Sequence, residues 1–200
     1  MPRMNELSPM WKTFSEIDIR PIRQEAEQTP RLALVGADDK TARFLSLLQH
    51  GPRGAEHLVT AIPTYRLPLQ AGELTALANY DLRIVLLEDA QHLQSDGVAA
   101  LLAQPAPLLL VQDPAQAGAM DAAPGGQARG LVQTVHCALE NSEAARKELL
   151  PAVAHLLSER QLAAGRAFPG LRPAVAHGLI ASTSRTNAGY AAGTGLAEMI

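Results

Sequence analysis

Three residues near the start of the chain have the types and the order of a phosphate-binding loop. Gly36 ends a short apolar run, and Lys40 and Thr41 follow it where a helix should begin. In the form G-x-x-x-x-G-K-[ST], backbone N–H groups surround the phosphates, the lysine reaches the terminal phosphates, and the hydroxyl group binds magnesium. Gly36, Lys40 and Thr41 are therefore the candidate nucleotide-binding residues.

This loop departs from the usual form in both length and charge. Only three residues separate Gly36 from Lys40, and the second glycine is absent. Asp38, which we expect to cap the helix, and Asp39 add negative charge at the helix N-terminus, where phosphates would have to lie. These departures favour a capping and solvating role over conventional nucleotide binding.

The acidic pair also suggests an alternative chemistry, that of a two-component receiver domain. Asp38 and Asp39 after a first strand, with Asp89 at a later strand end, suit a cluster that binds magnesium and accepts a phosphoryl group. A receiver further needs Ser or Thr after one strand and Lys after the next. Gln112-Asp113 and His136-Cys137 stand there instead, so a receiver-like regulator is the less favoured alternative.

The sequence predicts neither a metal site nor a reactive thiol. The six histidines show no H-x-x-x-H or H-x-E spacing, which zinc sites typically have. Cys137 is the only cysteine, so it forms no internal disulfide and indicates a reducing compartment. Because it follows an apolar run, we expect a buried, inert thiol, with His136 on the opposite face of the strand.

Length, composition and charge narrow the class of protein. The 200 residues are 47% hydrophobic, which is enough for a substantial core. Seventeen basic residues against twenty acidic ones give a formal charge of -3, so we expect no nucleic-acid partner. The first thirty residues lack the apolar run of a signal peptide, and no stretch is long enough to form a membrane span.

Apolar runs alternate with helical segments between residues 31 and 158. This alternation predicts an α/β fold, a three-layer sandwich with a mostly parallel sheet of about five strands. The expected strands are 31–36, 57–62, 83–87, 107–111 and 131–135. The expected helices are one after Asp38 that closes at His50-Gly51-Pro52, 71–80, 95–104, and 142–158 with Ser142 as its N-cap.

Four segments together resemble an Era-like small GTPase with the P-loop fold. The segments are Leu32-Ala-Leu-Val-Gly36, Tyr80 to Asp89, Pro107-Leu-Leu-Leu-Val111 and Val135-His-Cys-Ala-Leu139. They resemble, in order, the first strand, the strand after switch II, the strand before the guanine-reading loop and the strand of the Ser-Ala-Leu loop. The resemblance covers about residues 31–158.

The flanks resemble those of bacterial GTPase-associated membrane proteins of the YcjF type. The matching stretches are Trp11 to Arg23, Phe168 to Pro173, Asn187 to Tyr190 and Gly195 to Ile200. The resemblance implies a GTPase-like domain at the cytoplasmic face of a membrane, with a protein partner. It also implies apolar helices beyond Ile200, so that membrane association would arise from sequence after this residue.

The chain divides accordingly into three parts. Residues 1–30 are expected to form a helical arm for docking, in which Trp11, Phe14 and Ile17 recur at helical spacing. Residues 31–158 are the GTPase-like domain. Residues 159–200 are a C-terminal helical extension, with two helical pieces around Pro169 and Pro173.

The functional residues of a GTPase are largely missing. The stretch that should hold the Asp-x-x-Gly of switch II reads Thr60-Ala-Ile-Pro63, and the guanine-reading position reads Val111-Gln-Asp-Pro114. We therefore expect a catalytically silent domain that acts in protein binding or regulation, with no catalytic residue, cofactor or metal. The alternative is a working GTPase that binds GTP or GDP with magnesium through Gly36, Lys40 and Thr41.

Overall fold

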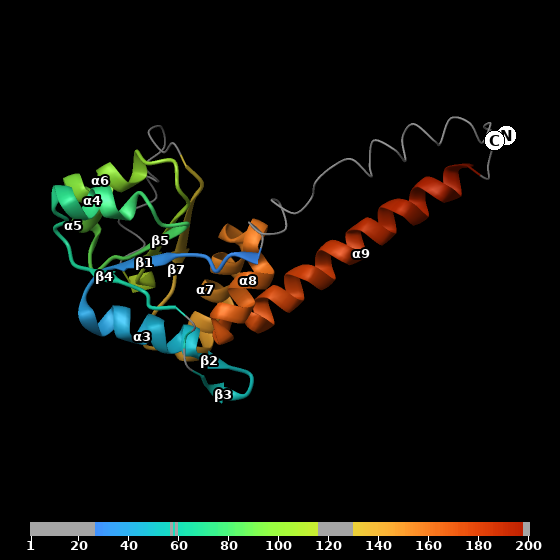
Figure 1. The fold of residues 1–200 in the computed structure, drawn as a ribbon, viewed down its shortest axis with the longest axis horizontal. Helices are drawn as coiled ribbons and strands as arrows, with labels where there is room; N and C mark the ends of the chain where they lie inside the picture. Colours follow the sequence, from blue (N-terminus) through green and yellow to red (C-terminus); the bar gives the residue numbers. More distant parts are fainter. Residues whose placement is uncertain (1–26, 57, 59, 116–129, 198–200) are drawn as a thin grey trace.

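A parallel five-stranded sheet forms the centre of the molecule in this computed structural model, which describes residues 27–56, 58, 60–115 and 130–197. The strands are β1 (Leu32–Val35), β4 (Thr64–Tyr65), β5 (Leu82–Leu86), β6 (Leu108–Gln112) and β7 (Val132–His136). They lie in the order β4-β1-β5-β6-β7, and all neighbours are parallel. The predicted α/β fold with about five parallel strands is confirmed (Figure 1).

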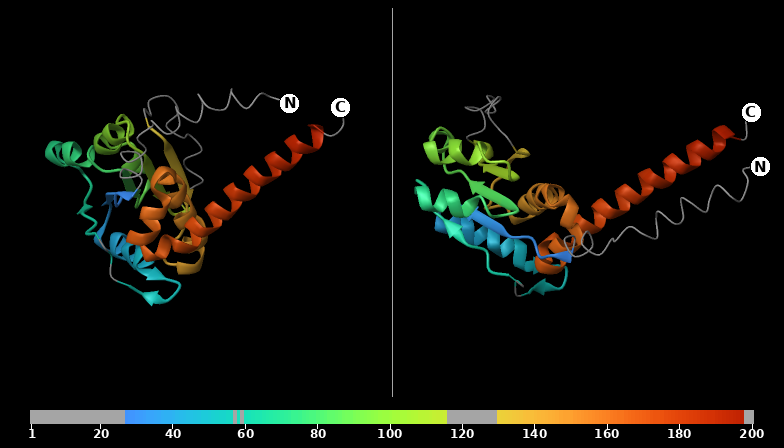
Figure 2. Two further views of the ribbon diagram at one scale, coloured as in Figure 1. Left: turned by 45° about the vertical axis from the view of Figure 1, so that its right-hand side comes forward. Right: turned by 45° about the horizontal axis from the view of Figure 1, so that its top comes forward.

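Helices cover both faces of the sheet, which gives the predicted three layers. Along β1, Leu32 and Leu34 belong to one apolar cluster, whereas Ala33 and Val35 belong to the other. This alternation follows from the two-residue period of a strand. The first cluster lies under α3 (Asp38–Gln49) and α7 (Ser142–Leu156), and the second under α4 (Ala71–Leu77) and α6 (Asp96–Leu102). Figure 2 shows the layers from two sides.

The predicted strand at 57–62 is wrong. Residues 58 and 60–62 are not in a strand, and the edge strand is the two-residue β4. Leu34 donates its N–H to the carbonyl oxygen of Pro63 at 3.0 Å, which sets Thr64 opposite Leu34. A hairpin that the sequence did not predict, β2 (His50–Gly51) with β3 (Gly54–Ala55), takes up part of the chain before it.

Both predicted N-caps are wrong by one residue. Ala37 is the N-cap of α3, and Asp38 is the first residue inside the helix. Asn141, not Ser142, caps α7, because its Oδ1 accepts hydrogen bonds from the N–H groups of Glu143 and Ala144 at 3.2 and 3.1 Å.

The C-terminal extension starts inside the core and then leaves it. After the short turn η2 (Ser158–Arg160) come α8 (Gln161–Ala167), η3 (Pro169–Leu171) and α9 (Arg172–Ala197). Phe168 and Leu171 are fully buried in the cluster beneath α3. Figure 1 shows α9 packing first on α7 and α8 and then extending away from the sheet.

One prediction concerns a segment that lies outside the described residues: the N-terminal arm, apart from residues 27–30. Among the helices that the structure describes, none combines the length and the apolar character needed to cross a membrane.

Candidate functional site

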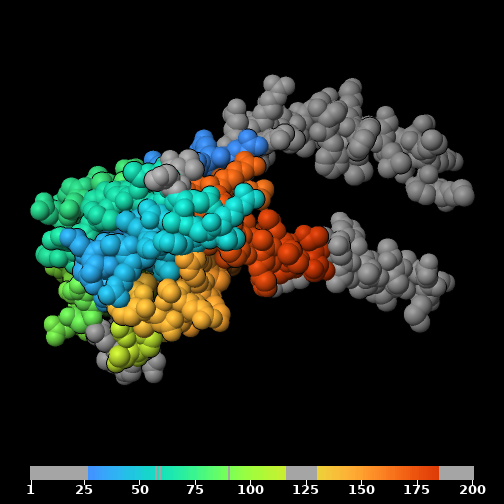
Figure 3. All heavy atoms as spheres, turned by 90° about the horizontal axis from the view of Figure 1, so that it is seen from below, coloured from blue at the N-terminus to red at the C-terminus, as the bar shows by residue number. Residues whose placement is uncertain are grey.

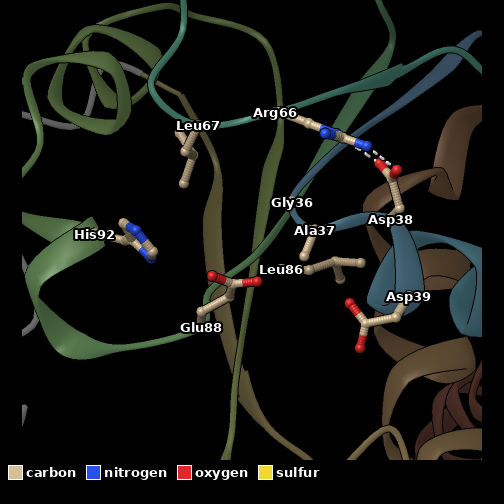
Figure 4. A pocket seen from close by; sticks show the side chains of 9 residues that line it. All are labelled: Gly36, Ala37, Asp38, Asp39, Arg66, Leu67, Leu86, Glu88 and His92. Carbon is tan, nitrogen blue, oxygen red and sulfur yellow. Dashed lines mark hydrogen bonds and ion pairs between the residues drawn. The ribbon is translucent and has the colours of Figure 1, made fainter.

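An open pocket of about 480 Å³ lies at the carboxyl edge of the sheet, between the ends of β1 and β5. The chain turns to opposite sides of β1 to form β4 and β5, and such a switch point is where open α/β sheets bind ligands. Its lining residues are Gly36, Ala37, Asp38, Asp39, Arg66, Leu67, Leu86, Glu88 and His92 (Figure 4). This pocket is the candidate functional site.

Gly36 forms the floor where β1 meets the pocket. A Cβ atom there would lie 2.9 Å from both the Cβ and the carbonyl oxygen of Leu86, and the φ angle of Gly36 is 156°. Its N–H donates to the carbonyl oxygen of Tyr65 at 2.9 Å. Only Ala37 separates Gly36 from α3, so the backbone forms no loop that could surround a phosphate.

Lys40 and Thr41 lie beside Gly36 as predicted, but their side chains do not line this pocket. The Nζ of Lys40 donates to the carbonyl oxygen of Leu87 at 3.0 Å, just past the end of β5. The hydroxyl of Thr41 donates to the carbonyl oxygen of Asp38 at 3.0 Å, and the residue is 3% exposed. Both polar groups are thus engaged within the fold rather than turned toward a ligand.

Negative charge dominates the pocket. Arg66 forms two contacts with the carboxylate of Asp38, one from Nε to Oδ1 at 2.7 Å and one from Nη2 to Oδ2. Asp39 and Glu88 also line the pocket, and neither has an ion-pair partner within the described ranges. One cation against three carboxylates favours a positively charged group and disfavours phosphate.

The sequence did not predict Arg66 as a residue of the site, because the second strand was expected at 57–62 and not at Thr64–Tyr65. With the strand at Thr64–Tyr65, the residue that follows it toward the pocket is Arg66 rather than a residue of the stretch Thr60-Ala-Ile-Pro63. The end of this edge strand therefore brings a guanidinium group to the site. Glu88 and His92 were also missed, although their place after an apolar run was a usable signal.

Asp89, the residue proposed for a receiver-like cluster, serves as a helix cap. Its Oδ1 accepts from the N–H groups of Gln91 at 2.7 Å and His92 at 3.0 Å, which starts α5 (Ala90–Leu93). The Nδ1 of His92 lies 3.8 Å from the same carboxylate oxygen. Within the residues that the structure describes, no three His, Cys, Asp or Glu side chains come together to hold a metal ion.

A second, much smaller hollow lies at the same edge of the sheet. The hollow between the ends of β5, β6 and β7 measures about 10 Å³ and is lined in part by Lys40, Gln112, Asp113 and Cys137. Cys137 is 3% exposed, and burial, followed by nearby carboxylates, raises the pKa of its thiol. The predicted buried thiol is confirmed, and His136 is exposed as expected.

No protein-family model, curated protein or solved structure matches this chain. The likeness to Era-like GTPases consequently rests on the sequence motifs.

Proposed function

We propose that this chain is a catalytically silent GTPase-like domain that binds or regulates a protein partner. The bond from Lys40 to the carbonyl oxygen of Leu87 is the observation that carries this proposal, because the lysine that would neutralise phosphates is used to join α3 to β5. Two further observations support the proposal: only Ala37 separates Gly36 from α3, and the hollow beside Gln112 measures about 10 Å³.

The proposal is tested by calorimetric titration of the chain with GDP, GTP and ATP, each with and without magnesium. We expect no heat of binding, because carboxylates at the start of α3 repel the phosphates. The double variant Lys40→Ala/Thr41→Ala is the control. Nucleotide binding that this variant abolishes would instead establish a working GTPase built on Gly36, Lys40 and Thr41.

A receiver-like regulator is the other rival function. Binding of the phosphoryl analogue beryllium fluoride with magnesium, lost in Asp89→Asn, would establish it. Our proposal expects no binding, because Asp89 is committed to capping α5 and because Arg66 already neutralises Asp38.

The pocket at the carboxyl edge is the proposed contact for the partner. Asp39 and Glu88 are carboxylates without an ion-pair partner in the described chain, so the group that fits there is a lysine or arginine side chain. A short arginine-containing peptide should shift the backbone amide resonances of Gly36 and Ala37. Asp39→Asn/Glu88→Gln should remove these shifts, and an equal response to a glutamate-containing peptide would contradict the assignment.

We further propose, from the sequence resemblance, that the domain works at the cytoplasmic face of a membrane-associated bacterial protein. This part rests on the flanking motifs around Phe168 to Pro173 and Asn187 to Tyr190. Fractionation of the native host cells with an antibody against the chain tests it. We expect the protein with the membrane fraction, and its recovery wholly in the soluble fraction would contradict the proposal.

A further inference from the structure

An apolar groove of about 440 Å³ runs between α8 and α9, remote from the pocket at the carboxyl edge. Three of the four large apolar side chains that the described chain exposes are on these two helices. Leu162 is 59% exposed, Leu179 is 37% exposed and Ile180 is 68% exposed. Leu162 and Leu179 line the groove, with Val175 and Ala176 between them. Such a cluster is typical of a surface that another segment covers.

Close packing of the two helices makes the groove a firm surface. Gly165 packs against Val175: a Cβ atom added to Gly165 would lie 3.7 Å from the side chain of Val175. Arg172, the first residue of α9, joins it to α8, because its Nε donates to the carbonyl oxygen of Gly165 at 3.2 Å. Its Nη1 also contacts Glu56, which follows β3, at 2.6 Å. The groove is therefore preformed rather than produced by an occupant.

We infer that the N-terminal arm of this same chain, through Trp11, Phe14 and Ile17, docks as a helix into the groove between α8 and α9. With 3.6 residues per turn, these three side chains fall with Leu7 and Met10 within an arc of about 120°. An apolar face of this kind matches a groove between two helices. This inference is independent of the proposed function.

The point where the arm leaves the domain supports this occupant. The N–H of Arg31 donates to Asp81 at 2.7 Å, and Arg160 contacts the same carboxylate oxygen at 3.1 Å. Arg160 directly precedes α8, so the chain enters the domain beside the helix that carries Leu162. In Figure 3 the first described residues, in blue, lie beside atoms coloured orange, which belong to the part of the chain that includes α8. The eight residues from 19 to 26 can span about 26 Å between the docked helix and the domain.

The arm and the groove also carry opposite charges, on Asp18 and on Arg166. Arg166 stands at the rim of the groove and has no ion pair or side-chain hydrogen bond in the described chain. On the helical arm, Asp18 falls within the same arc as the apolar side chains. An acidic group on an apolar face needs a cation to remain charged when it is covered, and Arg166 supplies it.

Trp11 is the only tryptophan of the chain, so its fluorescence reports on the arm directly. In the full chain we expect emission at shorter wavelength than in urea and protection from iodide quenching. Leu162→Ser/Leu179→Ser should move both signals to those of the unfolded chain while far-ultraviolet circular dichroism stays unchanged. Leu131→Ser, at a side chain that is 55% exposed outside the groove, is the matched control and should behave as the original chain.

Charge reversal tests the same contact. Arg166→Glu should expose Trp11, and Asp18→Arg/Arg166→Glu should restore its protection. A Trp11 that is open to iodide in the original chain, or that stays shielded in Leu162→Ser/Leu179→Ser, would overturn the inference. Shielding that increases with protein concentration would place a second copy in the groove and would overturn it as well.

Discussion

The Nζ atom of Lys40 lies 3.0 Å from the carbonyl oxygen of Leu87 and donates a hydrogen bond to it. Leu87 is 2% exposed, so this carbonyl group depends on a partner within the protein. A lysine at the start of α3 thereby closes the end of β5. Lys40, the residue that best matches a nucleotide-binding lysine in the sequence, therefore stabilises the contact between α3 and β5.

Replacing Gly36 by alanine should lower the free energy of unfolding by about 1–3 kcal/mol. The new Cβ would lie 2.9 Å from the Cβ and the carbonyl oxygen of Leu86, so β1 and β5 would have to move apart. Urea unfolding measures the change. Gly72→Ala is the matched control, because nothing lies within 4 Å of its Cβ position, and an equal response of both variants would contradict this reason.

Replacing Gly170 by alanine should loosen the C-terminal helices from the domain. A Cβ atom at this position would lie 2.0 Å from the carbonyl oxygen of Leu47. Because this oxygen is part of the backbone of α3, it cannot move aside easily. We expect a loss of about 3 kcal/mol by urea unfolding. Gly178→Ala in α9, where the nearest atoms are 3.8 Å away, should instead be neutral or slightly stabilising. Equal effects would show that η3 has room to move.

Arg83 should be essential for stability although it lies outside the candidate site. It is fully buried, and its guanidinium group donates to the carbonyl oxygens of Leu101, at 3.2 Å, and Ala106 and to the side chain of Gln104. Burial lowers its pKa to about 10, so it stays protonated at neutral pH. Arg83→Ala should cost about 3–5 kcal/mol in chemical unfolding, because it leaves a cavity and unpaired acceptors.

Arg83→Lys is the conservative counterpart and should restore little of that loss. A single ammonium group cannot reach the three acceptors that the planar guanidinium group serves. If Arg83→Lys unfolds at the same urea concentration as the original chain, this explanation is contradicted.

Tyr65 should ionise at unusually high pH. The hydrogen bond with Tyr80, whose hydroxyl oxygen is 3.5 Å away, raises the pKa of Tyr65 to about 12, and burial contributes. Tyr80→Phe should bring that pKa back toward 10, as followed by phenolate absorbance. An unchanged titration of Tyr65 in this variant would exclude the hydrogen bond as the cause.

The same shift predicts how stability depends on alkaline pH. The folded chain keeps the Tyr65 proton to higher pH than the unfolded chain, so its contribution to stability is complete below pH 10. It is lost as the pH rises toward about 12. Thermal unfolding of the original chain and of Tyr80→Phe, compared between pH 10 and pH 12, tests whether this contribution falls as the pH rises. A contribution that grows with pH would contradict it.

Four of the five sheet strands could be predicted because buried parallel strands are continuous apolar runs. The run at Leu82–Leu86, for example, is bounded by a polar turn and by Glu88. The edge strand Thr64–Tyr65 could not be predicted, because two residues carry no periodic signal and a more apolar run precedes them.

The positions of the site residues were easier to predict than their partners. Strand ends place Gly36 and Asp39 at the carboxyl edge of any parallel sheet. In contrast, the bonds from Lys40 to Leu87 and from Arg66 to Asp38 join residues 47 and 28 positions apart. Such contacts depend on how the helix and the edge strand lie against the sheet, which local sequence does not specify.

The central claim, that Lys40 is structural and that no nucleotide is bound, is tested most directly by urea unfolding of the original chain and Lys40→Met, with and without GTP and magnesium. Methionine retains the length of the side chain but cannot donate to Leu87, so we expect a loss of about 1–2 kcal/mol without nucleotide. GTP should move neither midpoint. A midpoint that GTP raises in the original chain but not in Lys40→Met would contradict the account, because a ligand that binds the folded state stabilises it.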